Sequence, residues 1–76
     1  MAEEKYRPKL MVMGVPHRVT YTNYRGETAK RTIIPINLWY GHTEWHTEDQ
    51  WLLKALDTEK DQIRDFAMKD MTPAWD

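Results

Sequence analysis

Two β-rich runs joined by a short turn constrain the fold of this chain more than any other feature. From His17 to Tyr24 (HRVTYTNY), β-branched and aromatic residues alternate with polar ones, as in a half-buried strand. The triplet Arg25-Gly26-Glu27 predicts a turn, and residues 28–34 form a second β-rich run. Pro35 follows this run, and because proline cannot donate to a ladder, we expect it at an edge or a strand end. The sequence therefore predicts a β-hairpin.

Over residues 47–71 two signals conflict. The segment opens with the capping-box pattern Thr-Glu-Asp-Gln and continues in residues that are nearly all good helix formers. Against a helix, Trp51-Leu52-Leu53 is apolar at three consecutive positions, and residues 57–61 have the composition of a polar turn. Residues 62–67 alternate polar and apolar like a hairpin arm. Propensity favours one long helix, whereas the pattern favours a second hairpin.

Composition limits the size of the core and the chemistry available. A chain of 76 residues buries only about 60–65% of its unfolded surface, so its nine aromatic residues must supply much of the core. We expect Tyr21, Trp51 and Phe66 to be packing residues. The absence of Cys and Ser excludes disulfides, thiolate zinc sites and hydrolases with a Ser or Cys nucleophile. We expect one domain over residues 10–72, between a flexible terminus (1–9) and a tail (73–76).

Hydropathy and charge predict the location of the protein and the kind of partner that it binds. No apolar run approaches the roughly 18–20 residues that span a bilayer, so we expect a cytoplasmic protein with no membrane contact. Residues 1–40 hold seven Lys and Arg against three acids, whereas residues 41–76 hold four against nine. A basic face formed by the first half would favour an anionic partner, although the charges alone favour a mixed, solvated surface.

A series of landmarks runs through most of the chain, in the order Tyr21, Tyr24, Arg25-Gly26-Glu27, Arg31, Ile33, Pro35, Leu38, Trp51-Leu52-Leu53, Ala55, Asp57, Arg64-Asp65-Phe66, Met68 and Met71. In this order they resemble the WYL domain, a module similar to Sm and SH3-like small β-barrels that is found in bacterial transcription regulators. Leu52 stands where that family has its middle Tyr, and the connection between Leu38 and Trp51 is longer than usual. Because the regulators' helix-turn-helix has no counterpart here, we expect a stand-alone binding module.

The resemblance implies a fold. It predicts a mainly β protein, either a small antiparallel SH3/Sm-like β-barrel or a curled sheet of four to five strands. A short helical turn is expected near residues 68–72. WYL-like modules often form dimers, so the resemblance also implies a homodimer.

The resemblance further implies that barrel side chains bind nucleic acid or a nucleotide-like ligand, and it places Arg31 and Arg64 at the family's Arg positions. A guanidinium suits this role because its planar fork of donors matches a phosphate and can stack on a base. The structural alternative is a pair of ion pairs, Arg31 with Glu27 across the turn and Arg64 with Asp61 or Asp65.

Other side chains extend the candidate site. Arg18 and Arg25 add positive charge, and Tyr24 and Trp39 offer surfaces on which a base can stack. Lys30 falls on the strand face opposite Arg31 and is left out. The predicted ligand-binding residues are Arg31, Arg64, Arg25, Arg18, Tyr24, Trp39 and His42. We predict no catalytic residue, metal ligand or cofactor.

The stretch from Gly41 to Trp51 (GHTEWHTEDQW) concentrates histidines, acids and tryptophans. His42 and His46 are four apart, which would place both imidazoles on one helical face as in zinc sites. Gly41 and the two Trp rings favour a loop instead, in which this spacing has no fixed geometry. We therefore expect a loop that folds back over the barrel, with Trp45 as its apolar anchor.

These observations lead to two hypotheses about function. The first is a non-enzymatic regulatory module that binds an anionic ligand, single-stranded nucleic acid or a nucleotide, through arginines and aromatic stacking. The alternative is a protein-interaction adaptor that uses the aromatic loop and the barrel edge. An enzyme is the least favoured class, because no nucleophile, acid–base pair or cofactor motif can be assembled from the sequence.

Overall fold

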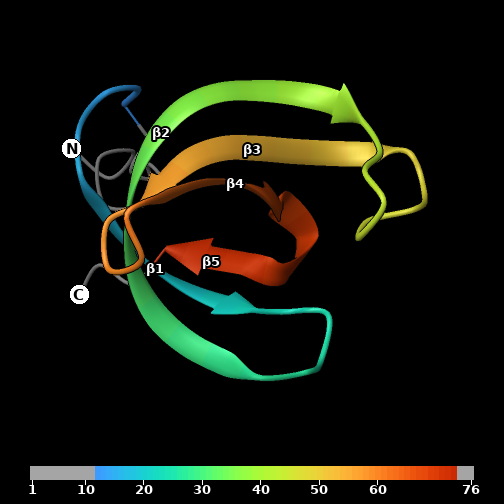
Figure 1. Cartoon of the computed structure of the whole chain (residues 1–76), viewed down its shortest axis with the longest axis horizontal. Helices are drawn as coiled ribbons and strands as arrows, with labels where there is room; N and C mark the ends of the chain where they lie inside the picture. The colour runs from blue at the N-terminus through green and yellow to red at the C-terminus, as the bar shows by residue number, and fades with distance from the viewer. Residues whose placement is uncertain (1–11, 74–76) are drawn as a thin grey trace, which may run out of the picture.

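The computed structural model describes residues 12–73, which form a single antiparallel sheet (Figure 1). The predicted flexible terminus, residues 1–9, and the tail beyond residue 73 lie outside this part of the chain. The strands are β1 (His17–Thr22), β2 (Thr28–Gly41), β3 (Gln50–Asp57), β4 (Gln62–Ala67) and β5 (Met71–Pro73), and the short 3-10 helix η1 (Met68–Asp70) precedes β5. Their order across the sheet is β4-β3-β2-β1-β5.

The predicted mainly β class, the antiparallel strands and the short helical turn near residue 68 are confirmed. The five strands form one open sheet rather than a closed barrel, with β4 and β5 as its edges. Within residues 12–73, no helix combines the length and the apolar character needed to cross a membrane.

The first hairpin forms as predicted, with β1 and β2 paired from His17 opposite Ile33 to Thr22 opposite Thr28. Asn23 holds the turn, because its Oδ1 accepts hydrogen bonds from the backbone amides of Arg25 (2.9 Å) and Glu27 (3.0 Å). Gly26 takes a positive φ of 82°, a conformation that favours glycine. The hydrogen bonds from these two backbone amides to Asn23 therefore fix the length of the loop and the register of the hairpin.

The position expected for Pro35 is wrong. Pro35 lies inside the 14-residue strand β2, in the middle of the sheet, and not at an edge or a strand end. The pairing of β2 with β3 shifts register between Pro35 and Asn37, and such a bulge accommodates a residue that cannot donate. Figure 1 shows β2 bending, so that its first part pairs with β1 and its second part with β3.

The second half of the chain is a hairpin, not a helix. Strands β3 and β4 pair from Leu52 opposite Ala67 to Asp57 opposite Gln62, with a tight turn between them. Leu52 and Leu53 are both buried although consecutive residues of a strand point to opposite faces of the sheet. Burial of both faces explains the run of apolar residues, and tertiary packing overrides the local helix propensity.

The core gathers on one face of the sheet and includes residues from β1 to β5: Val19, Tyr21, Ile33, Leu53, Ala55, Phe66 and Met71. The rings of Tyr21 and Phe66 meet edge to face, with centroids 4.9 Å apart, and the Tyr21 hydroxyl accepts a hydrogen bond from the Ala67 amide at 3.1 Å. The packing roles predicted for these two residues are confirmed. The role predicted for Trp51 is wrong, because Trp51 is 54% exposed near the end of the β2–β3 hairpin.

We expect Tyr21→Phe to lower the free energy of unfolding by about 1–3 kcal/mol, because the buried Ala67 amide would lose its acceptor. Urea unfolding followed by tryptophan fluorescence measures this loss. Tyr40→Phe is the matched control, since the Tyr40 hydroxyl lies at the surface in a long, 3.4 Å contact with the Asp49 carbonyl oxygen. Equal stabilities of the two variants would contradict the assigned role of the Tyr21 hydroxyl.

Alkaline pH provides a separate test of the same residue. Burial raises the pKa of Tyr21 above its ordinary value of about 10, because the ionised phenolate loses hydration in the core. The stability supplied by the neutral phenol is therefore fully present below about pH 10 and is lost as the pH rises through the raised pKa. The difference in stability between the wild type and Tyr21→Phe should shrink above about pH 10, and a constant difference would contradict this expectation.

Candidate ligand-binding site

A buried carboxylate joins the two arginines that the sequence singled out. Asp57, at the end of β3, is fully buried, and its Oδ2 lies 3.0 Å from Nη1 of Arg31 and 3.9 Å from Nη1 of Arg64. Strand register brings the arginines to the core face, because Arg31 pairs with Val19 and Arg64 pairs with Ala55. Both arginines therefore contact an acid, as the ion-pair alternative in the sequence analysis expected. The acid is Asp57, which they share, and not Glu27, Asp61 or Asp65.

The cluster carries more positive than negative charge, since two guanidinium groups face one carboxylate. The Arg31 side chain is only 13% exposed, and its Nε is buried without a hydrogen-bond partner among the described residues. The Arg64 side chain is 36% exposed, and its guanidinium lies over the Phe66 ring at 5.9 Å. Arg64 is thus the arginine of this cluster that a ligand can reach, while Arg31 neutralises the carboxylate from within.

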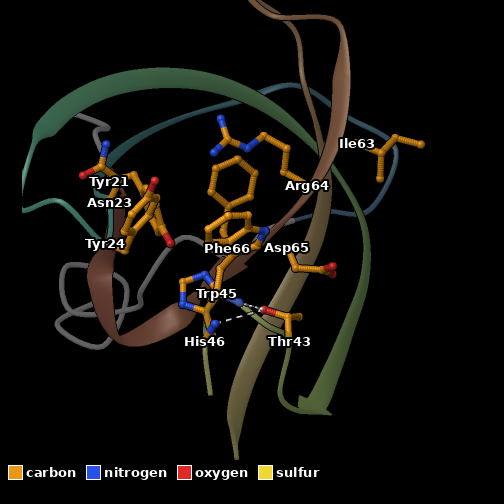
Figure 2. Close-up of a pocket in the computed structure, with 10 residues that line it drawn as sticks. All are labelled: Tyr21, Asn23, Tyr24, Thr43, Trp45, His46, Ile63, Arg64, Asp65 and Phe66. Carbon is orange, nitrogen blue, oxygen red and sulfur yellow. Dashed lines mark hydrogen bonds between the residues drawn. The ribbon is translucent and has the colours of Figure 1, made fainter. Parts of the chain in front are cut away.

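Arg64 lines a cavity of about 260 Å³ between the end of β1, the edge strand β4 and the β2–β3 loop. Figure 2 shows its guanidinium beyond the Phe66 ring, with Tyr24 to one side and Asp65 to the other. Tyr24 and Trp45 stack on each other, with ring centroids 5.5 Å apart and planes inclined at 28°. The lining residues are Tyr21, Asn23, Tyr24, Thr43, Trp45, His46, Ile63, Arg64, Asp65 and Phe66. The cavity therefore combines one accessible cation with stacking surfaces.

The loop between β2 and β3 is organised by its own polar side chains. The Thr43 hydroxyl accepts hydrogen bonds from the backbone amides of Trp45 (3.2 Å) and His46 (3.0 Å), the latter drawn in Figure 2. At the base of the loop, His42 Nδ1 lies 2.8 Å from Asp49 Oδ1. Trp45 is 64% exposed and stacks on Tyr24, so the loop contacts the turn of the first hairpin.

The Trp39 ring leaves little room for a side chain at Gly41, where the loop leaves β2. A Cβ atom at Gly41 would lie 2.6 Å from the Trp39 ring, closer than real Cβ contacts allow. The Trp39 indole in turn donates a hydrogen bond to Asp65 Oδ1 at 3.0 Å, across to β4. Trp39 therefore has a structural role, and it does not line the cavity. The loop is not helical, and no group of three metal-ligating side chains occurs within residues 12–73.

The structure places only some of the predicted site residues at the cavity. Arg64 and Tyr24 line the cavity, and the exposed guanidinium of Arg25 lies 5.7 Å from the centre of the Tyr24 ring. Arg18 lies elsewhere, bonded to the Thr32 hydroxyl at 3.0 Å and 3.8 Å from Glu59. Arg31, Trp39 and His42 are held by the protein contacts described above.

Several cavity residues were not among the predicted binding residues, including Asn23, Thr43, Trp45, His46 and Phe66. The Thr43 turn has a local signal, a hydroxyl two and three residues before the amides it binds. The stacking of Trp45 on Tyr24 joins residues 21 positions apart and has no signal in the local sequence. Comparison with models of protein families, with curated proteins and with solved structures gives no match for this chain.

We expect Asp57→Asn to lower the free energy of unfolding by about 3–5 kcal/mol, because the mostly buried Arg31 would lose its counter-charge. Urea unfolding measures the loss. Glu59→Gln is the control: its carboxylate makes an exposed 3.8 Å contact with Arg18 and should contribute little. The double variant Asp57→Leu/Arg31→Met should recover part of the stability, and equal effects of Asp57→Asn and Glu59→Gln would contradict the account.

Proposed function

We propose that this protein is a non-enzymatic binding module that recognises an anionic, nucleotide-like ligand, including single-stranded nucleic acid. The observation that supports this most directly is the cavity in which Arg64 lies beside the stacked rings of Tyr24 and Trp45. A nucleotide needs both elements, because its phosphate is matched by a guanidinium fork and its base gains from stacking on an aromatic ring.

The charge around Asp57 supports an anionic ligand. Arg31 already satisfies the Asp57 carboxylate at 3.0 Å, so Arg64, at 3.9 Å from the same oxygen, retains donors for a ligand. Arg25 adds a further positive charge beside Tyr24 at the surface. The acidic second half of the chain disfavours tight binding of plain duplex DNA, whose affinity depends on many phosphate contacts.

A binding role is favoured over catalysis because three polar side chains that line the cavity, those of Asn23, Thr43 and Asp65, are engaged in structure. Asn23 holds the hairpin turn and Thr43 holds the loop. Asp65 accepts from the Trp39 indole and lies 3.5 Å from Lys54 Nζ. The resemblance to the WYL domain supports the same role and extends it to regulation of transcription.

A second candidate function is a protein-interaction adaptor. Leu38, Tyr40 and Trp51 are 45–58% exposed near the end of the β2–β3 hairpin, and the Tyr40 and Trp51 rings meet at 5.3 Å. Exposed aromatic residues of this kind are typical of the core of protein interfaces. The two functions differ in salt response, since nucleic-acid affinity falls steeply with salt and an apolar protein contact changes little.

We expect labelled single-stranded DNA or RNA to bind the wild type at low salt, with an affinity that falls as salt increases. Arg64→Gln and Trp45→Ala should each weaken binding about tenfold or more, because they remove the phosphate contact and the stacking surface. Fluorescence anisotropy at low and physiological salt measures both effects. Arg18→Gln is the matched control, since it removes the same charge outside the cavity.

Equal loss of affinity in Arg64→Gln and Arg18→Gln would place binding on a diffuse basic surface and contradict the proposed site. If no oligonucleotide binds at low salt, the proposal fails. The protein-interaction function would then be tested by substitution of Tyr40 and Trp51.

A further inference from the structure

A second cavity also borders the stacked rings of Tyr24 and Trp45 and has a different chemistry. Its volume is about 230 Å³, and its lining residues are Tyr24, Trp45, His46, Thr47, Glu48, Gln50, Lys69 and Asp70. Tyr24, Trp45 and His46 line both cavities. Two acids face one lysine here, so this cavity disfavours a phosphate and favours groups that donate hydrogen bonds.

Gln50 gives this cavity an unused acceptor. Its Nε2 donates to the Glu48 carbonyl oxygen at 3.0 Å, which fixes the orientation of the amide. Its Oε1 is buried and has no hydrogen-bond partner among residues 12–73. An acceptor left in this state loses its hydration without compensation, and a donor supplied by a ligand would remove that cost. The Gln50 side chain lines the cavity, so a ligand bound there lies next to this amide.

We infer that Gln50 determines specificity: its Oε1 accepts a hydrogen bond from the exocyclic amino group of a base that stacks on Trp45. This inference rests on the proposed function. The two cavities orient the ligand. Arg64 attracts the phosphate to the first cavity, and Glu48 and Asp70 repel it from the second. Tyr24 and Trp45, which line both cavities, hold the base.

The ligand class is therefore a nucleotide whose base carries an exocyclic amino group. Cytosine presents an amino donor where uracil and thymine present a carbonyl acceptor. A carbonyl oxygen placed opposite Gln50 Oε1 would leave two acceptors facing each other. The site thus prefers cytosine to uracil, a pair of bases with the same ring size and nearly the same stacking surface.

The test compares fluorescently labelled oligo-dC and oligo-dU of equal length by anisotropy at low salt. The wild type should bind oligo-dC about five- to tenfold more tightly, the effect of one hydrogen bond. Gln50→Met, which keeps the length of the side chain and removes the amide, should bind the two oligonucleotides with equal affinity. Gln62→Met is the matched control, because Gln62 is exposed on β4 and lines neither cavity, and it should keep the preference.

The possible failures are distinct. If the wild type binds both oligonucleotides equally and Arg64→Gln loses both, the proposed function stands and the role of Gln50 is overturned. If Gln50→Met is folded and keeps the preference for oligo-dC, the role of Gln50 is overturned as well. If neither oligonucleotide binds, the proposed function and this inference fall together.

Discussion

The buried carboxylate of Asp57 is the interaction on which the rest of this structure depends. It is fully buried at the end of β3, and it lies 3.0 Å from Arg31 on β2 and 3.9 Å from Arg64 on β4. These contacts join three adjacent strands by charge, in addition to their backbone pairing and the core that they share. Because Arg31 supplies the closer contact, Arg64 can be held in place and still present its donors to the cavity. Structure and proposed function therefore share the same three side chains.

The cavity exists because two distant turns meet over the edge of the sheet. The Asn23 turn carries Tyr24, and the Thr43 turn carries Trp45 and His46. Strand β2 bends (Figure 1), its pairing shifts register between Pro35 and Asn37, and its second half pairs with β3 and leads into the loop. Tyr24 and Trp45 stack on each other where the two turns meet, and Trp45 remains largely exposed. This exposure leaves the face of an aromatic ring available to a ligand.

The sequence predicted the parts of the fold that local pattern determines. Alternation over residues 17–24 and the Arg25-Gly26-Glu27 triplet predicted the first hairpin, because the period of two and the turn residues act locally. Pro35 was misplaced because a bulge lets a central strand accept proline, and a bulge depends on the partner strand. Trp51 was misplaced because it lies beyond the end of the core. Arg31 and Arg64 were both named, but only the register could show that they share Asp57, and the stacking of Trp45 on Tyr24 required the folded loop.

The most direct test of this account is to follow the indole N–H signals of the tryptophans by NMR while a short single-stranded oligonucleotide is added at low salt. Trp45 lies in the cavity and Trp51 lies in the exposed cluster with Tyr40, so the two rings report on the two candidate surfaces. The account predicts a saturable shift of the Trp45 signal and no change at Trp51. A shift at Trp51 with none at Trp45 would contradict it.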